Sequence, residues 1–480
     1  MRAEILPSSA TCSCVVVISM YRLFVFGLLL PLLVSAGGCL DDQKSALLSL
    51  KNDLTYDALV STKLVGWNQS TSVECCDWGG VTCDESGHVT QLNLNKEGIR
   101  GPIPSYWEGL KYLKYLNLGY NSLDGNIPKS LLMPASSLED LDLSNNRLSG
   151  QIHGLMINVS SSRLRNLDLS SNRLEGPLTE FILKLPATIS TLTLSANKFT
   201  GRVELDMMVA KFKELYALDL SHNHLTVHAK NSVMMNTSTK LNSLMLASCK
   251  MRQIPDVRNQ STLKMLDLSD NELRGEIPNW IWEAGNGYLR FLNLSHNGFS
   301  SLQKPYTFPF LLDVLDLHSN MLQGDIPVPP RRVYILDYSN NNFKSAIPVG
   351  FGNVLRSTLY FSISNSRVVG LIPQSITRNA TSLRFLDLSR NALTGPIDPV
   401  IGSMKDLRSL DLSLNMLTGS IPEQLETGLK SLSFLNLSYN HLSGRIPQGS
   451  NFQKFTKLSF EGNEGLCGPP LNKTCPHART

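Results

Sequence analysis

A chain of 480 residues is long enough for two or three ordinary domains or for one extended array. Its net charge is +4 and 18% of its residues are charged, so neither a nucleic-acid partner nor an acidic tail is indicated. No phosphate-loop, zinc-protease, serine-hydrolase or kinase motif occurs. We therefore expect no catalysis, no cofactor and no metal.

The first 36 residues have the three-part layout of a secretory signal peptide. A basic Arg22 precedes an apolar stretch over residues 23–34, and small residues follow up to Ala36. Cleavage is expected after Ala36 or Gly38. The alternative is a retained membrane anchor, because residues 15–18 are also apolar. Either reading places the chain in the secretory pathway and then outside the cell or at its surface.

Residues 37–88 are expected to form an N-terminal cap. Residues 41–54 read as an amphipathic helix. Cys39 precedes this helix in the sequence, and Cys75, Cys76 and Cys83 follow it. In an oxidising compartment these cysteines are first of all disulfide candidates. Four cysteines allow three pairings. We favour the one without crossing, which is Cys39–Cys75 and Cys76–Cys83.

Export also predicts N-glycosylation at N-x-S/T sequons. The chain has eight of them, at Asn68, Asn158, Asn236, Asn259, Asn293, Asn379, Asn436 and Asn472.

Residues 89–447 repeat one frame at a spacing of 21 to 26 residues. The stretches LRNLDLSSNRLEGPL (164–178) and LRSLDLSLNMLTGSI (407–421) both follow L-x-x-L-x-L-x-x-N-x-L-x-G-x-I, the leucine-rich-repeat signature. This frame predicts an α/β solenoid, a right-handed superhelix with a parallel sheet on its concave side and a cap at each end. About fifteen strands are expected, centred on Leu92, Leu116, Leu141, Leu167, Leu192, Leu218, Leu244, Leu266, Leu292, Leu315, Leu336, Phe361, Leu386, Leu410 and Leu435.

The asparagine of the frame is expected to form a ladder of backbone hydrogen bonds between coils. Twelve units keep it, whereas Glu97, Cys249 and Ser366 replace it in the others. Cys249 is therefore expected to be a free structural thiol rather than a nucleophile.

Outward-facing aspartates also recur along the strands, at Asp142, Asp168, Asp219, Asp267, Asp316, Asp337, Asp387 and Asp411. A basic residue stands three positions before four of them, as Arg165 does before Asp168. This pattern favours a solvated face that neutralises its own charge over a metal site.

The outward position before each central leucine changes character along the chain. It is mostly polar in the first half and mostly apolar from Met265 onward. An exposed apolar column is a candidate binding surface, although neighbouring side chains could also bury it. We expect a protein or peptide ligand on this concave column, with anchors and rim residues at Phe291, Tyr360, Phe385, Phe434, Arg390 and Tyr439.

Residues 448–480 are expected to form the C-terminal cap, closed by a Cys467–Cys475 disulfide. No apolar run follows these cysteines in the sequence, so no C-terminal membrane span is expected.

The combination of motifs resembles the plant receptor-like proteins. The resemblance rests on CCDWGGVTCDESGHVTQLNL (75–94), on the L-x-G-x-I-P form of the repeat and on SFEGNEGLCGPPLNKTC (459–475). The stretches DYSNNNFKSAIPVGFGN (337–353) and SISNSRVVGLIPQSI (362–376) are similar to the Ve-type wilt-resistance branch.

The resemblance implies a ligand sensor in plant defence or signalling that works with a receptor-like kinase as co-receptor. The membrane anchor usual in that family is not found here. Attachment to the plasma membrane would then need a retained N-terminal segment or a partner. The alternative is a secreted inhibitor of microbial cell-wall enzymes, similar to the polygalacturonase-inhibiting proteins. Those have about ten repeats and a different C-terminal cap.

Overall fold

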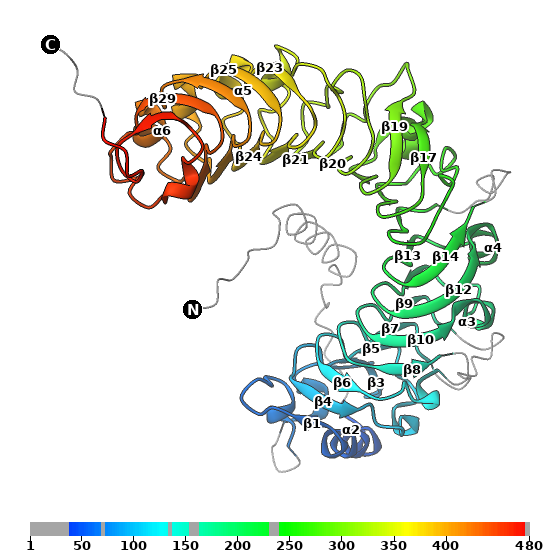
Figure 1. The fold of residues 1–480 in the computed structure, drawn as a ribbon. Coiled ribbons are helices and arrows are strands. Elements are labelled where there is room, and N and C mark those ends of the chain that lie inside the picture. Colours follow the sequence, from blue (N-terminus) through cyan, green and yellow to red (C-terminus); the bar gives the residue numbers. More distant parts are fainter. Residues whose placement is uncertain (1–37, 69–72, 133–136, 153–162, 230–239, 476–480) are drawn as a thin grey trace.

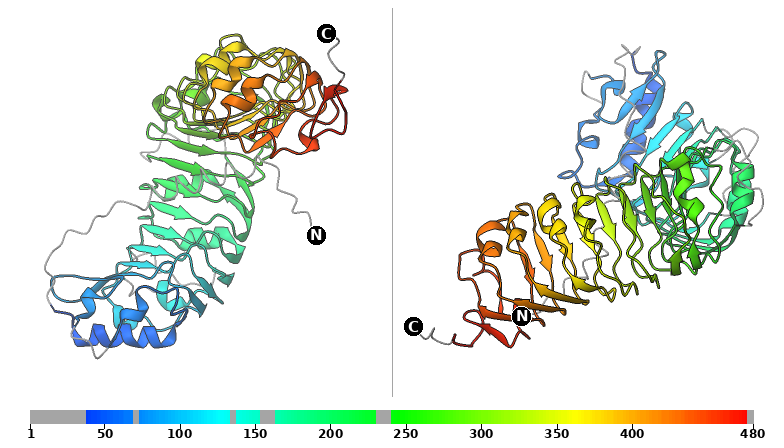
Figure 2. Two further views of the ribbon diagram at one scale, coloured as in Figure 1. Left: turned by 90° about the vertical axis from the view of Figure 1, so that its left-hand side faces the viewer. Right: turned by 90° about the horizontal axis from the view of Figure 1, so that it is seen from above.

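The computed structural model describes residues 38–68, 73–132, 137–152, 163–229 and 240–475. The predicted signal peptide and the sequons at Asn158 and Asn236 lie outside these residues. The described chain winds into a curved solenoid that opens on one side (Figure 1) and twists along its length (Figure 2).

One sheet of sixteen strands follows the inner side of the arc (Figure 1). All neighbouring strands are parallel except the first pair, β2 and β3, which is antiparallel. The strands are β2 Val81–Cys83, β3 Val89–Asn93, β5 Tyr115–Asn117, β7 Asp140–Asp142, β9 Asn166–Asp168, β11 Thr191–Thr193, β13 Ala217–Asp219, β15 Ser243–Met245, β16 Met265–Asp267, β18 Phe291–Asn293, β20 Val314–Asp316, β21 Ile335–Asp337, β22 Tyr360–Ser362, β24 Phe385–Asp387, β26 Ser409–Asp411 and β28 Phe434–Asn436.

The fifteen predicted central residues all lie in this sheet and in register with one another. Leu386 pairs with Leu410, for example, and Leu410 pairs with Leu435. The predicted solenoid and its strand register are therefore confirmed.

Shorter sheets form where the chain returns from one inner strand to the next. They break between β6 and β8, between β14 and β17 and between β19 and β23. At the second of these breaks the intervening unit lacks the L-x-G-x-I segment and reads MRQIPDV at residues 251–257. Most of the other units have a glycine at this point, which takes a left-handed conformation that other residues rarely adopt, as Gly419 does with φ +79°. The strands are β1 Thr55–Tyr56, β4 Ile99–Pro102, β6 Ser122–Asp124, β8 Ser149–Gln151, β10 Arg173–Pro177, β12 Lys198–Glu204, β14 His224–His228, β17 Arg274–Ile277, β19 Gly298–Leu302, β23 Val369–Leu371, β25 Ala392–Pro396, β27 Met416–Gly419, β29 His441–Arg445 and β30 Gly465–Cys467.

Helical segments are short apart from the first one. The α-helices are α2 Asp41–Asp53, α3 Leu178–Lys184, α4 Leu205–Lys211, α5 Gln374–Asn379 and α6 Glu423–Gly428. The 3-10 turns are η1 Leu64–Gly66, η2 Cys75–Asp77, η3 Glu108–Leu110, η4 Lys129–Leu132, η6 Asn279–Gly287, η7 Phe351–Asn353, η8 Pro399–Ser403 and η9 Lys457–Ser459.

A continuous apolar core runs through the solenoid. In one unit, Leu410, Leu412 and Leu417 are fully buried and Ile421 is 3% exposed. Each buried leucine of this kind contributes about 1.5–3 kcal/mol relative to an exposed one. Since every unit shares this core with its neighbours, the units stabilise one another.

The predicted asparagine ladder is present. Asn415 donates from Nδ2 to the carbonyl oxygens of Leu388 and Leu412 at 3.0 and 3.1 Å, and its Oδ1 accepts from the Leu393 amide at 3.0 Å. Asn463 in the C-terminal cap repeats this pattern and extends the ladder by one unit, which the sequence analysis did not anticipate.

The three replacements keep the ladder connected in different ways. Glu97 accepts hydrogen bonds from the Ser61 hydroxyl and from the amides of Thr62 and Lys63, so it joins the N-terminal cap to the first repeat. Ser366 donates to the Tyr338 carbonyl oxygen at 3.0 Å. Cys249 is free and fully buried, and burial raises the pKa of its thiol far above the usual value, as expected for a structural residue.

Both ends of the core are closed by disulfide-bonded caps. The structure contains Cys39–Cys75, Cys76–Cys83 and Cys467–Cys475, which are the favoured pairings. Helix α2 is fixed by the buried Gln43, which donates to the Gly109 carbonyl oxygen at 3.0 Å and accepts from the Val89 amide at 3.3 Å.

Candidate functional site

The apolar column on the concave sheet divides into a buried part and an exposed part. Phe291 is 1% exposed and Tyr360 is 9% exposed, so the prediction that they are accessible ligand anchors is wrong. The reason is crowding between strands that lie about 4.8 Å apart. Phe291 forms an apolar cluster with its neighbours on successive strands, namely Met245, Met265, Val314 and Ile335.

Phe385 and Phe434 behave differently, because a small residue stands between them. They are 42% and 48% exposed, and each is paired in register with Ser409 on β26. The two rings therefore lie on strands about 9.6 Å apart, on either side of a serine. Both rings are therefore about half exposed, although Phe385 still packs against Tyr360 on β22, with ring centroids 6.2 Å apart.

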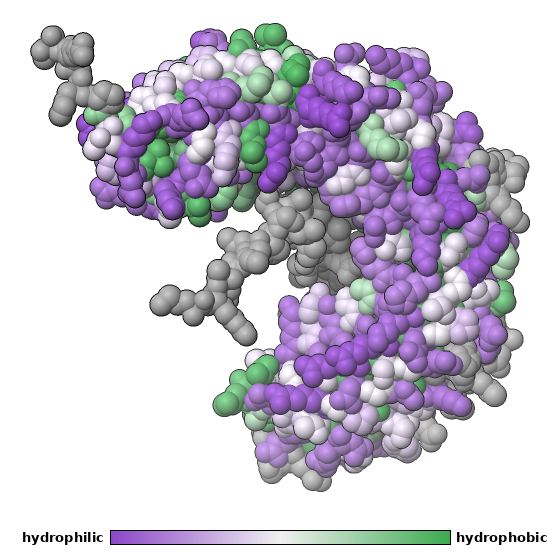
Figure 3. Space-filling model, viewed as in Figure 1, coloured by the Kyte–Doolittle hydropathy of each residue, from purple (hydrophilic) through white to green (hydrophobic). Residues whose placement is uncertain are grey.

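The turn that follows each of these strands adds further exposed side chains. Arg390, Leu414 and Tyr439 occupy the same turn position in three successive units, all with a positive φ near 54°. Leu414 is 38% exposed, Tyr439 is 50% exposed and Arg390 is also exposed. We call the set Phe385, Leu414, Phe434 and Tyr439, with Arg390 beside it, the C-terminal aromatic patch. Elsewhere the visible surface is mainly hydrophilic with small apolar patches (Figure 3).

The outward aspartates have a structural role at the ends of the strands. Asp411 accepts a hydrogen bond from the Ser413 amide at 2.9 Å, and each of the seven others accepts one from the amide two residues on. This bond closes an Asx turn. The basic residue three positions earlier does not supply the expected neutralisation for Asp168, because Arg165 is paired with Glu214 at 2.7 Å.

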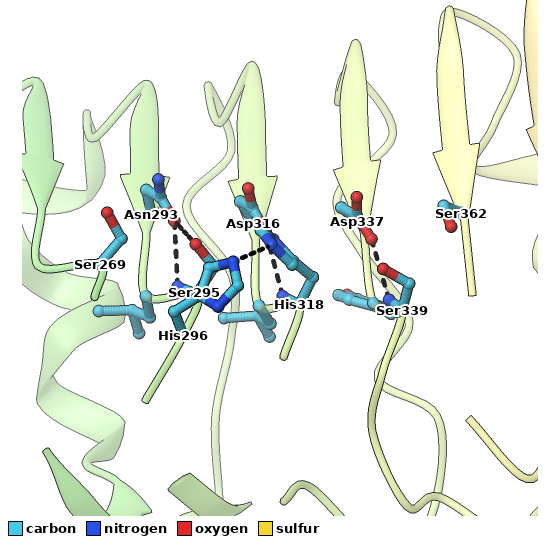
Figure 4. Close-up of polar contacts among 12 residues, drawn as sticks. Ser269, Asn293, Ser295, His296, Asp316, His318, Asp337, Ser339 and Ser362 are labelled. Carbon is cyan, nitrogen blue, oxygen red and sulfur yellow. Dashed lines mark hydrogen bonds and ion pairs between the residues drawn. The ribbon is translucent and has the colours of Figure 1, made fainter. Parts of the chain in front are cut away.

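A polar cluster missed by the sequence analysis lies beside the buried part of the column. Figure 4 shows Asp316 and Asp337 at the ends of β20 and β21, with the rings of His296 and His318 close together. His318 Nδ1 lies 2.6 Å from Asp316 Oδ1, and the Nε2 atoms of the two histidines are 2.9 Å apart. The available signal was His318 itself, which stands where other units have a serine such as Ser339.

Burial and charge shift the titration of this cluster. Burial, together with the neighbouring Asp316 carboxylate, raises the pKa of Asp337 to about 7. Burial alone would lower the pKa of His318, but its hydrogen bond to Asp316 and the charges of Asp316 and Asp337 together outweigh burial, and the net shift is upward. The pKa of His296 is lowered by burial and by the nearby His318.

A groove of about 430 Å³ lies on the flank, where the return sheets break. Its lining includes Arg252, Arg258 and Trp280. Arg252 pairs with Glu272 at 2.8 Å and Arg258 pairs with Asp256 at 2.6 Å. Because two of its three arginines are already paired, the groove is a weaker ligand candidate than the aromatic patch.

The predicted glycosylation sites differ in accessibility. Asn68, Asn259 and Asn472 are exposed, and Asn379 and Asn436 are partly exposed. Asn293 is 4% exposed and accepts a hydrogen bond from the Ser295 hydroxyl at 2.7 Å. Among the sequons of the described residues, Asn293 is therefore the least accessible to a glycan.

Comparison with known proteins places the repeats among leucine-rich-repeat sequences. A leucine rich repeat N-terminal domain matches residues 40–84. Leucine rich repeat models match residues 87–148, 163–185, 262–284 and 381–442. Within the described residues, no helix combines the length and the apolarity that crossing a bilayer requires.

Relatives and solved structures agree with this assignment. Receptor-like protein 54 of Arabidopsis thaliana is 31% identical over 266 residues, which are 55% of this chain and 32% of the relative. The plant peptide hormone receptor RGFR1 in complex with RGF2 aligns with a TM-score of 0.62 at 27% identity, over 78% of this chain and 67% of the receptor.

A second receptor aligns about as well. The ectodomain of the membrane receptor kinase GASSHO1/SCHENGEN3 from Arabidopsis thaliana, in complex with CASPARIAN STRIP INTEGRITY FACTOR 2, gives a TM-score of 0.59 at 28% identity. That alignment covers 80% of this chain and 45% of the ectodomain. The matches to curated relatives span between 21% and 51% of the relatives' length. The chain thus carries a leucine-rich-repeat N-terminal domain followed by leucine-rich repeats, and it is homologous to the receptor-like proteins of Arabidopsis.

Proposed function

We propose that this protein is an extracellular recognition module that binds a peptide or a protein segment on the C-terminal half of its concave sheet. The observation that carries the proposal is the exposure of Phe385 and Phe434 on either side of Ser409. Aromatic residues beside an arginine are the usual composition of binding hot spots. Tyr439 and Arg390 would contact the ligand at the rim, since both are exposed in the turns that follow β28 and β24.

The solved relatives support a peptide as the kind of ligand. RGFR1 and GASSHO1/SCHENGEN3 are both in complex with a partner, RGF2 and CASPARIAN STRIP INTEGRITY FACTOR 2 respectively. We extend this mode of binding to the present chain. We further propose that it acts in plant defence or signalling without catalysis, and that a receptor-like kinase is its signalling partner.

A displayed peptide library provides a probe for this proposal. Phage-borne random peptides would be selected on the purified protein, and the best peptide would be titrated against variants. Phe385→Ala with Phe434→Ala should weaken binding by at least about 30-fold, the equivalent of about 2 kcal/mol for one anchor.

The matched control is Leu371→Ala with Met416→Ala. These residues are 61% and 44% exposed but lie on β23 and β27 of the return sheet. The control should bind like the wild type. Equal losses in both double variants, or unchanged binding in the first, would contradict the proposed site.

A further inference from the structure

The polar cluster at the ends of β18, β20 and β21 brings four metal-binding side chains together. His296, Asp316, His318 and Asp337 come from three successive units of the solenoid (Figure 4). Donor atoms of Asp316, His318 and Asp337 all lie within 4.8 Å of one another. His296 is outside that set and joins the cluster through His318, since its Nε2 is 2.9 Å from Nε2 of His318.

The orientation of His318 is set by Asp316. The carboxylate oxygen lies 2.6 Å from Nδ1, so Nδ1 carries the ring hydrogen and donates a hydrogen bond to the carboxylate. In the neutral ring this leaves a lone pair on Nε2, on the side that faces His296. A carboxylate behind an imidazole is the arrangement that orients histidines bound to zinc.

Asp337 is held by neutral donors. Its carboxylate accepts from the Ser339 amide at 2.9 Å and from the Tyr360 hydroxyl at 3.2 Å. Both bonds orient the group without neutralising it, so the carboxylate keeps its capacity to bind a cation. This contact also turns Tyr360 toward Asp337 on the neighbouring strand, where its side chain is 9% exposed.

We propose that this cluster is a binding site for one divalent transition-metal ion of the zinc type, with Nε2 of His296, Nε2 of His318 and the carboxylate of Asp337 as ligands and Asp316 as a positioning residue. Two imidazoles with a carboxylate suit zinc and its neighbours rather than calcium or magnesium. Two nitrogens on a tetrahedral zinc lie about 3.3 Å apart, so the 2.9 Å between the two histidines needs only a small opening. Asp337 shares a set of donors within 4.8 Å of one another with His318 but not with His296, so metal binding also requires Asp337 and His296 to approach each other.

A metal ion could enter the site from solvent, and its binding would have a structural consequence. His318 and Asp316 are 8% and 1% exposed, whereas His296 is exposed and forms the open side of the cluster. An ion bound there would link three successive units across the concave sheet. The inference departs from the sequence analysis, which expected no metal, and it does not depend on the proposed ligand.

Cobalt and zinc titrations test the proposal. The full secreted protein would be produced without a histidine tag, freed of metal with a chelator and titrated with Co²⁺ while its visible absorption is recorded. We expect one equivalent to bind with a ligand-field band typical of tetrahedral coordination, and Zn²⁺ to displace it. Asp316→Asn should weaken binding by about 10- to 100-fold.

The sharpest variant is His318→Ser, because it restores the residue found at the same place in other units, such as Ser339 and Ser413. It should fold, as checked by its thermal melt, and bind metal more weakly than Asp316→Asn. His441→Ser on β29 is the matched control and should bind like the wild type. Equal metal binding by the wild type and His318→Ser, or no binding by a folded wild type, would overturn the proposal.

Discussion

Replacement of Asn415 by alanine tests how much the asparagine ladder contributes to the fold. The Asn415 side chain is 7% exposed, and it bonds the Leu388 carbonyl oxygen and the Leu393 amide of the preceding unit. In Asn415→Ala both backbone groups lose this partner inside the core. An unsatisfied buried group costs about 1–3 kcal/mol. The two groups together should therefore cost about 2–6 kcal/mol of unfolding free energy.

Urea unfolding followed by circular dichroism measures the total loss of unfolding free energy. Hydrogen exchange by mass spectrometry shows which residues lose protection. Exchange should accelerate in residues 388–417, including the Leu393 amide. Asn415→Ser is the control, because Ser366 at the equivalent position still bonds the Tyr338 carbonyl oxygen and accepts from the Asn341 amide. It should lose less than the alanine variant. If Asn415→Ala unfolds within about 0.5 kcal/mol of the wild type, the range of an ordinary surface substitution, the ladder does not act as described.

Burial raises the pKa of Asp267 to about 6, with His222 lowering it and Asp219 raising it. The folded state then binds this proton more tightly than the unfolded chain, so Asp267→Asn should raise the unfolding free energy by about 3 kcal/mol at pH 7.5 and by only about 0.5 kcal/mol at pH 4. An equal increase at both pH values in urea unfolding would contradict this. Cys467→Ser with Cys475→Ser opens a disulfide of sequence separation 8. That variant should lose about 2.5 kcal/mol of unfolding free energy, seen as a lower melting temperature of the C-terminal units. An unchanged melting temperature would show that this disulfide does not stabilise the cap. Glycopeptide mapping should find glycan on the exposed Asn472 and none on the buried Asn293; a glycan on Asn293 would show that this unit is more open than described.

The repeat frame predicted the solenoid because each of its residues has one structural job. Leu410 must face the core and Asn415 must satisfy backbone groups, wherever the unit lies in the array. These roles depend on neighbours at fixed sequence distances, so a single sequence suffices to predict them. The extra ladder residue Asn463 was missed because the unit around it, EGNEGLCG at residues 461–468, keeps few of the leucines of the frame.

Exposure on the concave face depended on side chains from other strands. Phe291 and Phe385 occupy the same position of the frame, yet one is buried by large residues on the adjacent strands and the other lies beside Ser409. The identity of the neighbours across the sheet decides the outcome. His318 was passed over for a similar reason, since its contact with His296 joins two units 22 residues apart.

Site-specific photo-crosslinking tests the central claim, that a ligand lies on the concave sheet at its C-terminal half, most directly. A benzophenone amino acid would replace Phe434 in one protein and Leu371, on the return sheet, in another. Each protein would be irradiated with the selected peptide, and the adducts would be identified by mass spectrometry. The account predicts an adduct from position 434 and none from position 371. An adduct from position 371 alone would contradict it.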